Sequence, residues 1–174
     1  MNLLNPRAWA AAPICVVIVS GALSGCSAGQ QAQTATMAPA VNGSMATLDN
    51  IALRNIRIRA EQTSYAVQPG KTVHLALVAT NQSPDTADAL VAVTADIGAV
   101  TLVGNTAIPA EGILIVDSPD RVVHAGALAA VKPANTATAT VKLTKPISNG
   151  LIYEFTFRLA HAGETTVGVP VSAD

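Results

Sequence analysis

Apolar and polar residues alternate in short runs from about residue 47 to the end of the chain, and this period of two limits the fold more than any other feature of the sequence. Successive side chains of a β-strand point to opposite faces, so alternation predicts strands with one buried face. No window of a dozen residues keeps the 3.6-residue period of a helix. In the clearest run, the apolar positions are Leu151, Tyr153, Phe155, Phe157 and Leu159. We expect this aromatic stripe to lie in a core rather than to form a binding platform.

Turn residues divide this region into eight or nine short strands. The expected strands cover residues 48–59, 73–80, 90–94, 99–103, 113–116, 121–123, 137–143, 151–159 and 165–171. A change of parity between Leu53 and Ile56 predicts a β-bulge in the first of them. Many short strands at this spacing are typical of an all-β sandwich or barrel.

Residues 1–25 have the organisation of an export signal. Arg7 carries the only charged side chain in this segment, and a run of apolar residues follows it. A positive start, an apolar centre and small residues at the end are the three parts of a secretory signal peptide. Pro13 and Gly21 interrupt the run, which is shorter than the about 20 apolar residues of a membrane-spanning helix. We therefore predict a signal peptide that is removed from the mature protein.

The signal ends in Leu23-Ser24-Gly25-Cys26, which resembles the lipobox of bacterial lipoproteins. In such a motif the thiol of Cys26 receives a diacylglyceryl group, and the small Ser24 and Gly25 allow the signal peptidase to reach the bond before it. The acyl chains then hold the mature protein at a membrane surface, each buried CH₂ contributing about 0.8 kcal/mol. A plain signal peptide or a membrane-spanning anchor that happens to end in Cys is the alternative. We predict lipidation of Cys26, with Leu23, Ser24 and Gly25 as the recognition residues.

Residues 26–46 are predicted to form a flexible tether that begins at the acylated cysteine. After Cys26 the segment has no charged or aromatic residue and almost no large aliphatic residue. Such a segment buries too little apolar surface to offset the entropy of ordering it. At roughly 5–6 Å times the square root of the residue number, its mean reach is on the order of 25 Å. The β domain is expected over residues 47–174.

Composition excludes several classes of function. The net charge is -1 and charged residues are only 12% of the chain, which is not the basic footprint of a nucleic-acid binder. Half of the residues are apolar, which excludes a highly charged disordered chain. Two cysteines are too few for a disulfide scaffold or a thiolate zinc site. The chain has no G-x-S-x-G motif and no glycine-rich phosphate loop, so we expect neither catalysis nor a cofactor.

Several segments between about residues 72 and 172 carry a family resemblance. They are Val123-His124-Ala125-Gly126-Ala127, Val131-Lys132-Pro133-Ala134-Asn135, Leu143-Thr144-Lys145-Pro146-Ile147-Ser148-Asn149-Gly150, Phe155-Thr156-Phe157, Ala162-Gly163 and Val169-Pro170-Val171. They resemble the corresponding segments of the periplasmic copper chaperones called PCu(A)C. The resemblance implies an immunoglobulin-like or cupredoxin-like β-sandwich of about eight short strands.

The copper ligands of that family are not matched in this chain. The family binds Cu(I) through a His-x-Met pair, an earlier His and a further Met, whose soft thioether and imidazole donors suit this ion. The corresponding positions here are Ala137-Thr138-Ala139, Val103 and the segment 113–115. We therefore expect no metal at this ligand set. A metal carrier of PCu(A)C type with a rearranged site is kept as an alternative.

A second set of segments extends over nearly the whole chain. They are VNGSMATLDNIALRNIRI at residues 41–58, QPGK at 68–71, NQSPD at 81–85, DIG at 96–98 and LTKPISNGLIYEFTF at 143–157. Together with the lipobox and the tether, they resemble the LpqE-type lipoproteins of mycobacteria. The name of that family implies a location and a lipid anchor rather than an activity.

Histidine and arginine side chains are the remaining candidates for a site. The histidines are His74, His124 and His161, and no pair of them has metal-ligand spacing. We expect surface or partly buried imidazoles, although a site assembled by the fold is not visible in a sequence. Arg54, Arg57 and Arg59 allow two interpretations: contact with anionic lipid headgroups beside the anchor, or a solvated strand edge that charge keeps from pairing. The second interpretation is favoured.

These features predict a secreted lipoprotein that Cys26 anchors to the extracytoplasmic face of the cell membrane. Its β domain is expected to be a non-catalytic binding or support module for an envelope protein, a glycan or a lipid, and not for nucleic acid. The alternatives are the metal carrier and a binder of a small apolar ligand or lipid.

Overall fold

The computed structural model describes residues 43–60, 66–122 and 132–173 of the chain. The predicted signal peptide, Cys26, the tether up to residue 42 and His124 lie outside the described residues. Within these ranges, no helix has the length and apolarity that are needed to cross a bilayer.

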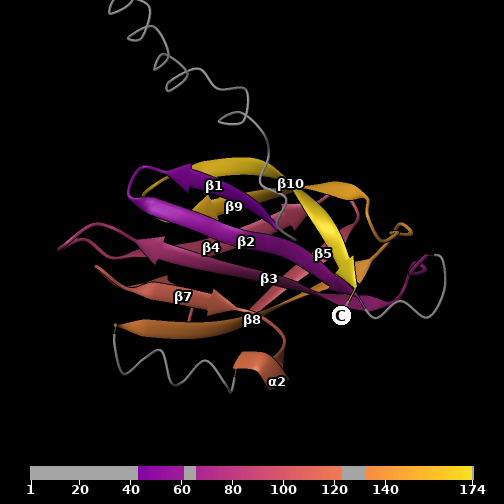
Figure 1. Cartoon of the computed structure of the whole chain (residues 1–174), viewed down its shortest axis with the longest axis horizontal. Helices are drawn as coiled ribbons and strands as arrows, with labels where there is room; N and C mark the ends of the chain where they lie inside the picture. The colour runs from indigo at the N-terminus through magenta and orange to yellow at the C-terminus, as the bar shows by residue number, and fades with distance from the viewer. Residues whose placement is uncertain (1–42, 61–65, 123–131, 174) are drawn as a thin grey trace, which may run out of the picture. The chain divides into compact units, whose positions relative to one another are not determined.

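Ten strands and one short helix account for the regular structure of the described residues (Figure 1). The strands are β1 (Ser44–Leu48), β2 (Ile51–Ala60), β3 (Thr72–Asn81), β4 (Asp88–Ala95), β5 (Gly98–Gly104), β6 (Ala107–Ile108), β7 (Ile113–Val116), β8 (Ala134–Leu143), β9 (Ile152–Leu159) and β10 (Glu164–Ala173). The helix is α2 (Pro119–Val122). The predicted all-β class is therefore confirmed.

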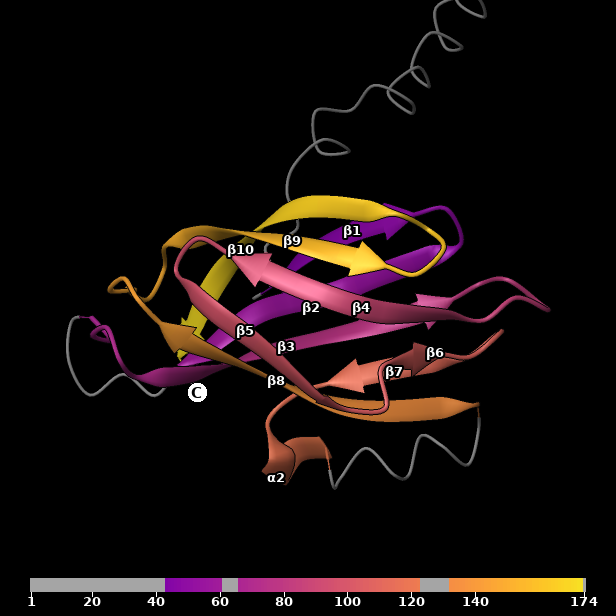
Figure 2. The same cartoon turned by 180° about the vertical axis from the view of Figure 1, so that it is seen from behind.

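The strands form one hydrogen-bonded sheet that closes on itself (Figures 1 and 2). Its order is β1-β2-β10-β9-β4-β5-β8-β3-β7, and an additional pairing between β2 and β3 completes the ring. Strands β4 and β5 pair only at Ala95 and Gly98, after which β5 pairs along its length with β8. A Cβ atom at Gly98 would overlap the carbonyl oxygen of Lys142, so glycine permits this close approach. This differs from the expected sandwich of two separate sheets, because the pairing of β2 with β3 and of β4 with β5 joins the two halves into one sheet.

The first predicted strand is divided by a tight turn. Leu48 pairs with Ile51, and Asp49 between them has φ of 48°, a conformation that Asp and Asn tolerate better than most residues. Strand β1 starts at Ser44, so residues 44–46, which we assigned to the tether, already pair with β2. Ser44 and Ala46 are small and Met45 is a lone large apolar residue, so no alternation placed this segment in the sheet.

The predicted β-bulge is confirmed in β2. The register between β2 and β3 shifts between Arg54 and Arg57, and Asn55 has φ of 56°. The extra residue increases the local twist of the strand. Long, bent β2 pairs with β1 and β10 as well as with β3, and it therefore joins the two halves of the closed sheet.

The aromatic stripe packs in the core, as predicted. Phe155 and Phe157 are fully buried, and their ring centroids lie 6.4 Å apart. Tyr153 is partly buried, and its hydroxyl oxygen accepts a hydrogen bond from the backbone N–H of Ser148 at 3.0 Å. Leu151 does not belong to the buried stripe, because it precedes β9 and is 54% exposed.

The strand that we expected at residues 121–123 is wrong. Residues 119–122 form α2 instead, and the backbone N–H groups of Arg121 and Val122 both donate to the carbonyl oxygen of Ser118 at 3.1 Å. Pro119 occupies the first helical position, where its missing N–H costs nothing. The Ser-Pro-Asp sequence thus starts a helical turn rather than a turn between two strands.

Candidate functional site

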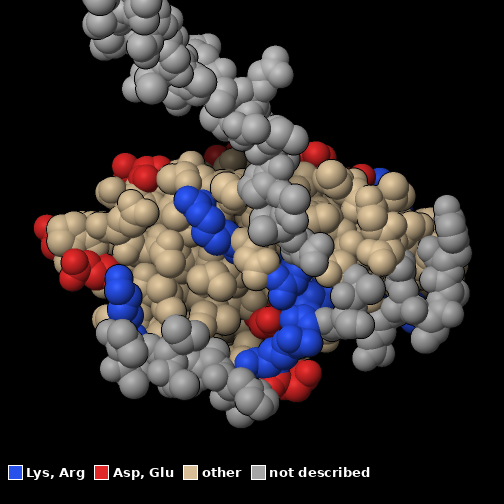
Figure 3. All heavy atoms as spheres, in the orientation of Figure 1, with Lys and Arg blue, Asp and Glu red and all other residues tan. Residues whose placement is uncertain are grey.

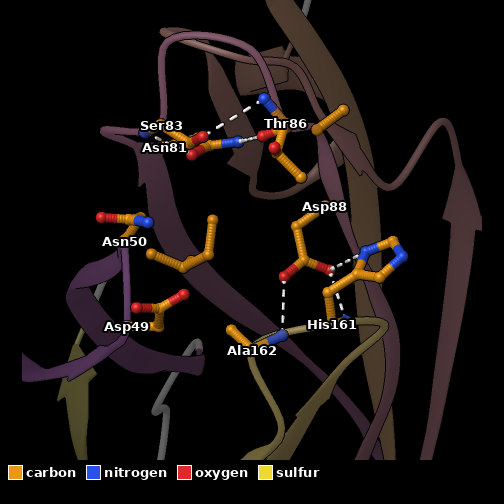
Figure 4. Close-up of a pocket in the computed structure, with 10 residues that line it drawn as sticks. Asp49, Asn50, Asn81, Ser83, Thr86, Asp88, His161 and Ala162 are labelled. Atoms are coloured by element: carbon orange, nitrogen blue, oxygen red, sulfur yellow. Dashed lines mark hydrogen bonds and ion pairs between the residues drawn. The ribbon is translucent and has the colours of Figure 1, made fainter.

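A polar pocket of about 150 Å³ lies between the β1–β2 turn, the loop before β4 and the β9–β10 turn (Figure 4). Its lining residues are Asp49, Asn50, Ile51, Asn81, Ser83, Thr86, Ala87, Asp88, His161 and Ala162. The volume is below the roughly 300–1,000 Å³ of a typical small-molecule site. Seven of the ten lining residues have polar or charged side chains, so this small pocket gives no support to the predicted alternative of an apolar ligand at this place.

Asp88 is the buried charge of this pocket. Its Oδ1 accepts hydrogen bonds from the backbone N–H groups of Ala89, Ala160 and His161 at 2.7, 2.9 and 3.0 Å, and its Oδ2 accepts one from Ala162 at 3.0 Å. Burial alone would raise the pKa of Asp88, but the four N–H donors outweigh it and lower the pKa below the ordinary value. The carboxylate of Asp88, which is the first residue of β4, therefore holds the β9–β10 turn against the start of this strand.

His161 adds little to this arrangement. Its Nδ1 lies 3.6 Å from Oδ1 of Asp88, and its side chain is 72% exposed. An ion pair that is so exposed to water stabilises a protein by at most about 1 kcal/mol. We therefore assign the ordering of the turn to the backbone donors rather than to the imidazole.

The loop that precedes β4 is held by its own side chains. The Nδ2 group of Asn81 donates to the carbonyl oxygens of Thr86 and Ile108 at 2.7 and 3.3 Å, and its Oδ1 accepts the N–H of Ser83 at 2.9 Å. The hydroxyl oxygen of Ser83 accepts the N–H of Thr86 at 3.2 Å. The hydroxyl groups of Ser83 and Thr86 are not hydrogen-bonded to a histidine among the described residues. No pair of a nucleophile and a base therefore forms in this pocket of the described structure.

A second polar site lies on the outer face of β2. The Nη1 atom of Arg59 lies 3.3 Å from both carboxylate oxygens of Asp117, and Arg59 is only 5% exposed. Arg57 donates a hydrogen bond to Oδ1 of Asn55. Arg54 donates to the carbonyl oxygens of Ala46 and Leu53 at 2.7 and 2.8 Å and thereby fastens β1 to β2.

These contacts change the interpretation of the arginines. We favoured a solvated strand edge, but β2 has hydrogen-bonded neighbours on both sides and Arg59 is buried against Asp117. The sequence placed Arg57 and Arg59 on the same face of a strand. It did not reveal Asp117 as the ion-pair partner of Arg59, because Asp117 is 58 residues away.

The histidines do not form a common site in the described structure. His74 lies on β3 beside Arg59 and Thr140, and its Nδ1 is buried without a hydrogen-bond partner among the described residues. His161 lies in the β9–β10 turn. The described residues contain no group of three His, Cys, Asp or Glu side chains that could hold a metal ion.

The positions that match the family's copper ligands lie side by side on β5, β7 and β8. Val103 pairs with Thr138, and Val116, next to the segment Ile113–Ile115, pairs with Ala137. Ala137 and Ala139 are buried, whereas Val103 is 61% exposed. The fold thus brings these positions together, but their side chains offer no thioether or imidazole donor.

Comparison with solved structures defines the class of domain first. The described fold is similar to that of PCuAC domains. The copper-bound PCuAC domain from PmoF2 is similar with a TM-score of 0.55 and 18% identity, covering 75% of this chain and 99% of that chain. The apo PCuAC domain from PmoF1 is similar with a TM-score of 0.56 and 17% identity, covering 75% and 100%. At this level of identity the likeness shows the fold alone.

Sequence comparison then places the chain in a family. The LpqE-like family matches residues 51–171. The protein named "Putative lipoprotein LpqE" of Mycobacterium tuberculosis (strain ATCC 25618 / H37Rv) is 51% identical over 175 residues, covering 99% of this chain and 92% of the relative. Its namesake in Mycobacterium leprae (strain TN) is 47% identical over 163 residues, covering 91% and 85%. The chain therefore belongs to the LpqE-like family.

Leu23, Ser24, Gly25 and Cys26 all lie outside the described residues, so the geometry of the domain does not bear on them.

Proposed function

We propose that this LpqE-like protein is held by a diacylglyceryl group on Cys26 at the extracytoplasmic face of the cell membrane. The observation that carries the proposal is the relationship to proteins named as lipoproteins, which covers 99% of this chain and so extends over the motif that ends in Cys26. The signal-like segment before this motif supports export, and the single thiol after it supports acylation at one position.

The β domain then acts as a non-catalytic binding or support module of the envelope. Its most strongly held polar groups support this part of the proposal. Asp88 uses its carboxylate to order a turn, Asn81 uses its amide to order a loop, and Asp117 neutralises Arg59. Side chains committed in this way stabilise a scaffold and offer little chemistry to a substrate.

The lysines of the domain allow a direct test of the membrane face. Lys71, Lys132, Lys142 and Lys145 are all exposed. We expect a membrane-impermeant amine reagent to label the protein in intact spheroplasts as strongly as in lysed ones, while a cytoplasmic control protein is labelled only after lysis. Labelling of this protein only after lysis would contradict the proposal.

A second candidate function, transport of copper, is favoured only by the PCuAC fold. We expect anaerobic titration of the full-length lipoprotein with Cu(I), in competition with a chromophoric chelator, to show no binding tighter than micromolar. The reason is that apolar side chains occupy the positions of the family's ligands at Val103, Ala137 and Ala139. Stoichiometric binding in the nanomolar range would establish a metal carrier with different ligands.

A further inference from the structure

We propose that the arginine-bearing face of β2 and α2 docks on the anionic phospholipid headgroups of the membrane that holds the anchor. This inference rests on the proposed lipid anchor and adds an orientation of the domain to it. We call the set Arg54, Arg57, Arg59 and Arg121 the basic face. Arg59 is buried against Asp117, so it contributes charge to this face rather than contact with a headgroup. Figure 3 shows a cluster of basic side chains at the lower centre of the face in view, with acidic side chains between and beside them.

The first argument is the place at which the tether joins the domain. Gly43 packs on the bulge of β2, where a Cβ atom on Gly43 would lie 2.9 Å from both the carbonyl carbon and Oδ1 of Asn55. Asn55 lies between Arg54 and Arg57 in β2. At roughly 5–6 Å times the square root of the residue number, a linker with the length of residues 26–43 has a mean reach of about 23 Å. The acyl anchor therefore keeps this side of the domain close to the membrane.

The second argument is charge. The basic face carries four arginines, and the described carboxylates beside them are Asp117 and Asp120. Arg57 makes a hydrogen bond to Asn55 but no ion pair with a carboxylate of the described residues. Burial and the neighbouring guanidinium groups of Arg59 and Arg121 lower the pKa of Arg57, although Asp117 opposes this. A phosphate group at this position would relieve the repulsion between the guanidinium groups.

The third argument is the chemistry of the side chains. A guanidinium group binds phosphate oxygens with two parallel hydrogen bonds, which suits a phosphodiester headgroup. Met45 of β1 is 47% exposed, and the carbonyl oxygen of the next residue, Ala46, accepts a hydrogen bond from Arg54. An apolar side chain among arginines is typical of a surface that lies in the interfacial region of a bilayer.

The test uses the full-length acylated protein in vesicles of phosphatidylcholine, with or without phosphatidylglycerol. An environment-sensitive fluorophore is attached to a Pro119→Cys variant at the start of α2, because Cys26 is acylated in the mature chain. The matched control carries it on Val103→Cys, which is 61% exposed on β5, a strand turned toward the viewer in Figure 2. We expect a blue shift of the emission only for Pro119→Cys and only on anionic vesicles, and we expect high salt to reverse it.

Removal of the arginines should weaken docking by a defined amount. Arg57→Gln and Arg121→Gln should each lower the ratio of docked to undocked protein about fivefold, which corresponds to about 1 kcal/mol per arginine near an anionic surface. Arg121 is exposed, so its single variant tests docking even if Arg57→Gln fails to fold. Arg158→Gln removes the same charge from an exposed position on β9 and should leave the blue shift unchanged.

Two results would overturn the inference in distinguishable ways. If both kinds of vesicle retain the protein and the Pro119→Cys emission is the same on each, docking is wrong and the anchor stands. If neither kind retains it, the anchor is absent, and the proposed function fails together with the docking.

Discussion

Replacing Cys26 by serine should abolish acylation and eliminate the mature, membrane-held form of the protein. The transfer of the diacylglyceryl group requires the thiol, and a serine hydroxyl is a much weaker nucleophile than a thiolate at neutral pH. Each acyl CH₂ that no longer enters the bilayer removes about 0.8 kcal/mol of membrane affinity, so loss of two acyl chains removes the anchor entirely.

The measurement is metabolic labelling with palmitate, followed by separation of membrane and soluble fractions. The wild-type chain should carry the label and sediment with membranes, and Cys26→Ser should carry none. Ser27→Ala, at the next residue, is the matched control and should be labelled like the wild type. Palmitate label on the Cys26→Ser variant would show that a residue other than Cys26 carries the lipid and would contradict the prediction.

Replacing Asp88 by alanine should lower the free energy of unfolding by about 3 kcal/mol. The change leaves the backbone N–H groups of Ala89, His161 and Ala162 without their acceptor, and a buried donor left unsatisfied costs about 1–3 kcal/mol. The N–H of Ala160 keeps a second acceptor, the carbonyl oxygen of Ala89, at 3.0 Å. The total is lower than the sum of three such costs because His161 is exposed and its N–H group can turn to water. Asp88→Asn should cost only about 1–2 kcal/mol, since its carbonyl oxygen can keep the three bonds to Oδ1 while its NH₂ group faces the N–H of Ala162.

Denaturant unfolding of the full-length protein in detergent measures these differences. Asp85→Ala is the matched control, because Asp85 lies in the same loop and is exposed, and we expect a change within about 0.5 kcal/mol. Equal stability of Asp88→Ala and the wild type would show that the β9–β10 turn is ordered by other contacts.

The same carboxylate should make stability depend on pH in the acid range. Its pKa is lowered in the folded state, so its contribution is fully present above the unfolded value of about 3.9 and is lost as pH falls through the lower folded value. Asp88→Asn lacks this titration. We therefore expect the stability gap between the wild type and Asp88→Asn to narrow below about pH 4 and to stay constant above it.

The local features of the fold were readable in the sequence where one residue pattern decided the structure. Alternation around Phe155 and Phe157 placed β9 and its buried face, and the parity change before Ile56 placed the bulge of β2. The helix at Pro119 was missed because a single turn has no periodicity to detect. Closure of the sheet was missed because it depends on the pairing of β2 with β3, which alternation does not encode.

The sites were less accessible than the fold because their partners are distant in the sequence. Asp88 binds backbone groups 72 to 74 residues away, and the Arg59–Asp117 pair spans 58 residues. Asp88 stood in the sequence only as the last residue of a polar loop. A buried acceptor of main-chain N–H groups has no sequence signal of its own, because the donors belong to every residue type.

The intact mass of the protein isolated from membranes tests the lipid anchor most directly. The account predicts a chain that begins at Cys26 and carries the added mass of a diacylglyceryl group on its N-terminal residue. An unmodified chain, or one that retains residues 1–25, would contradict it.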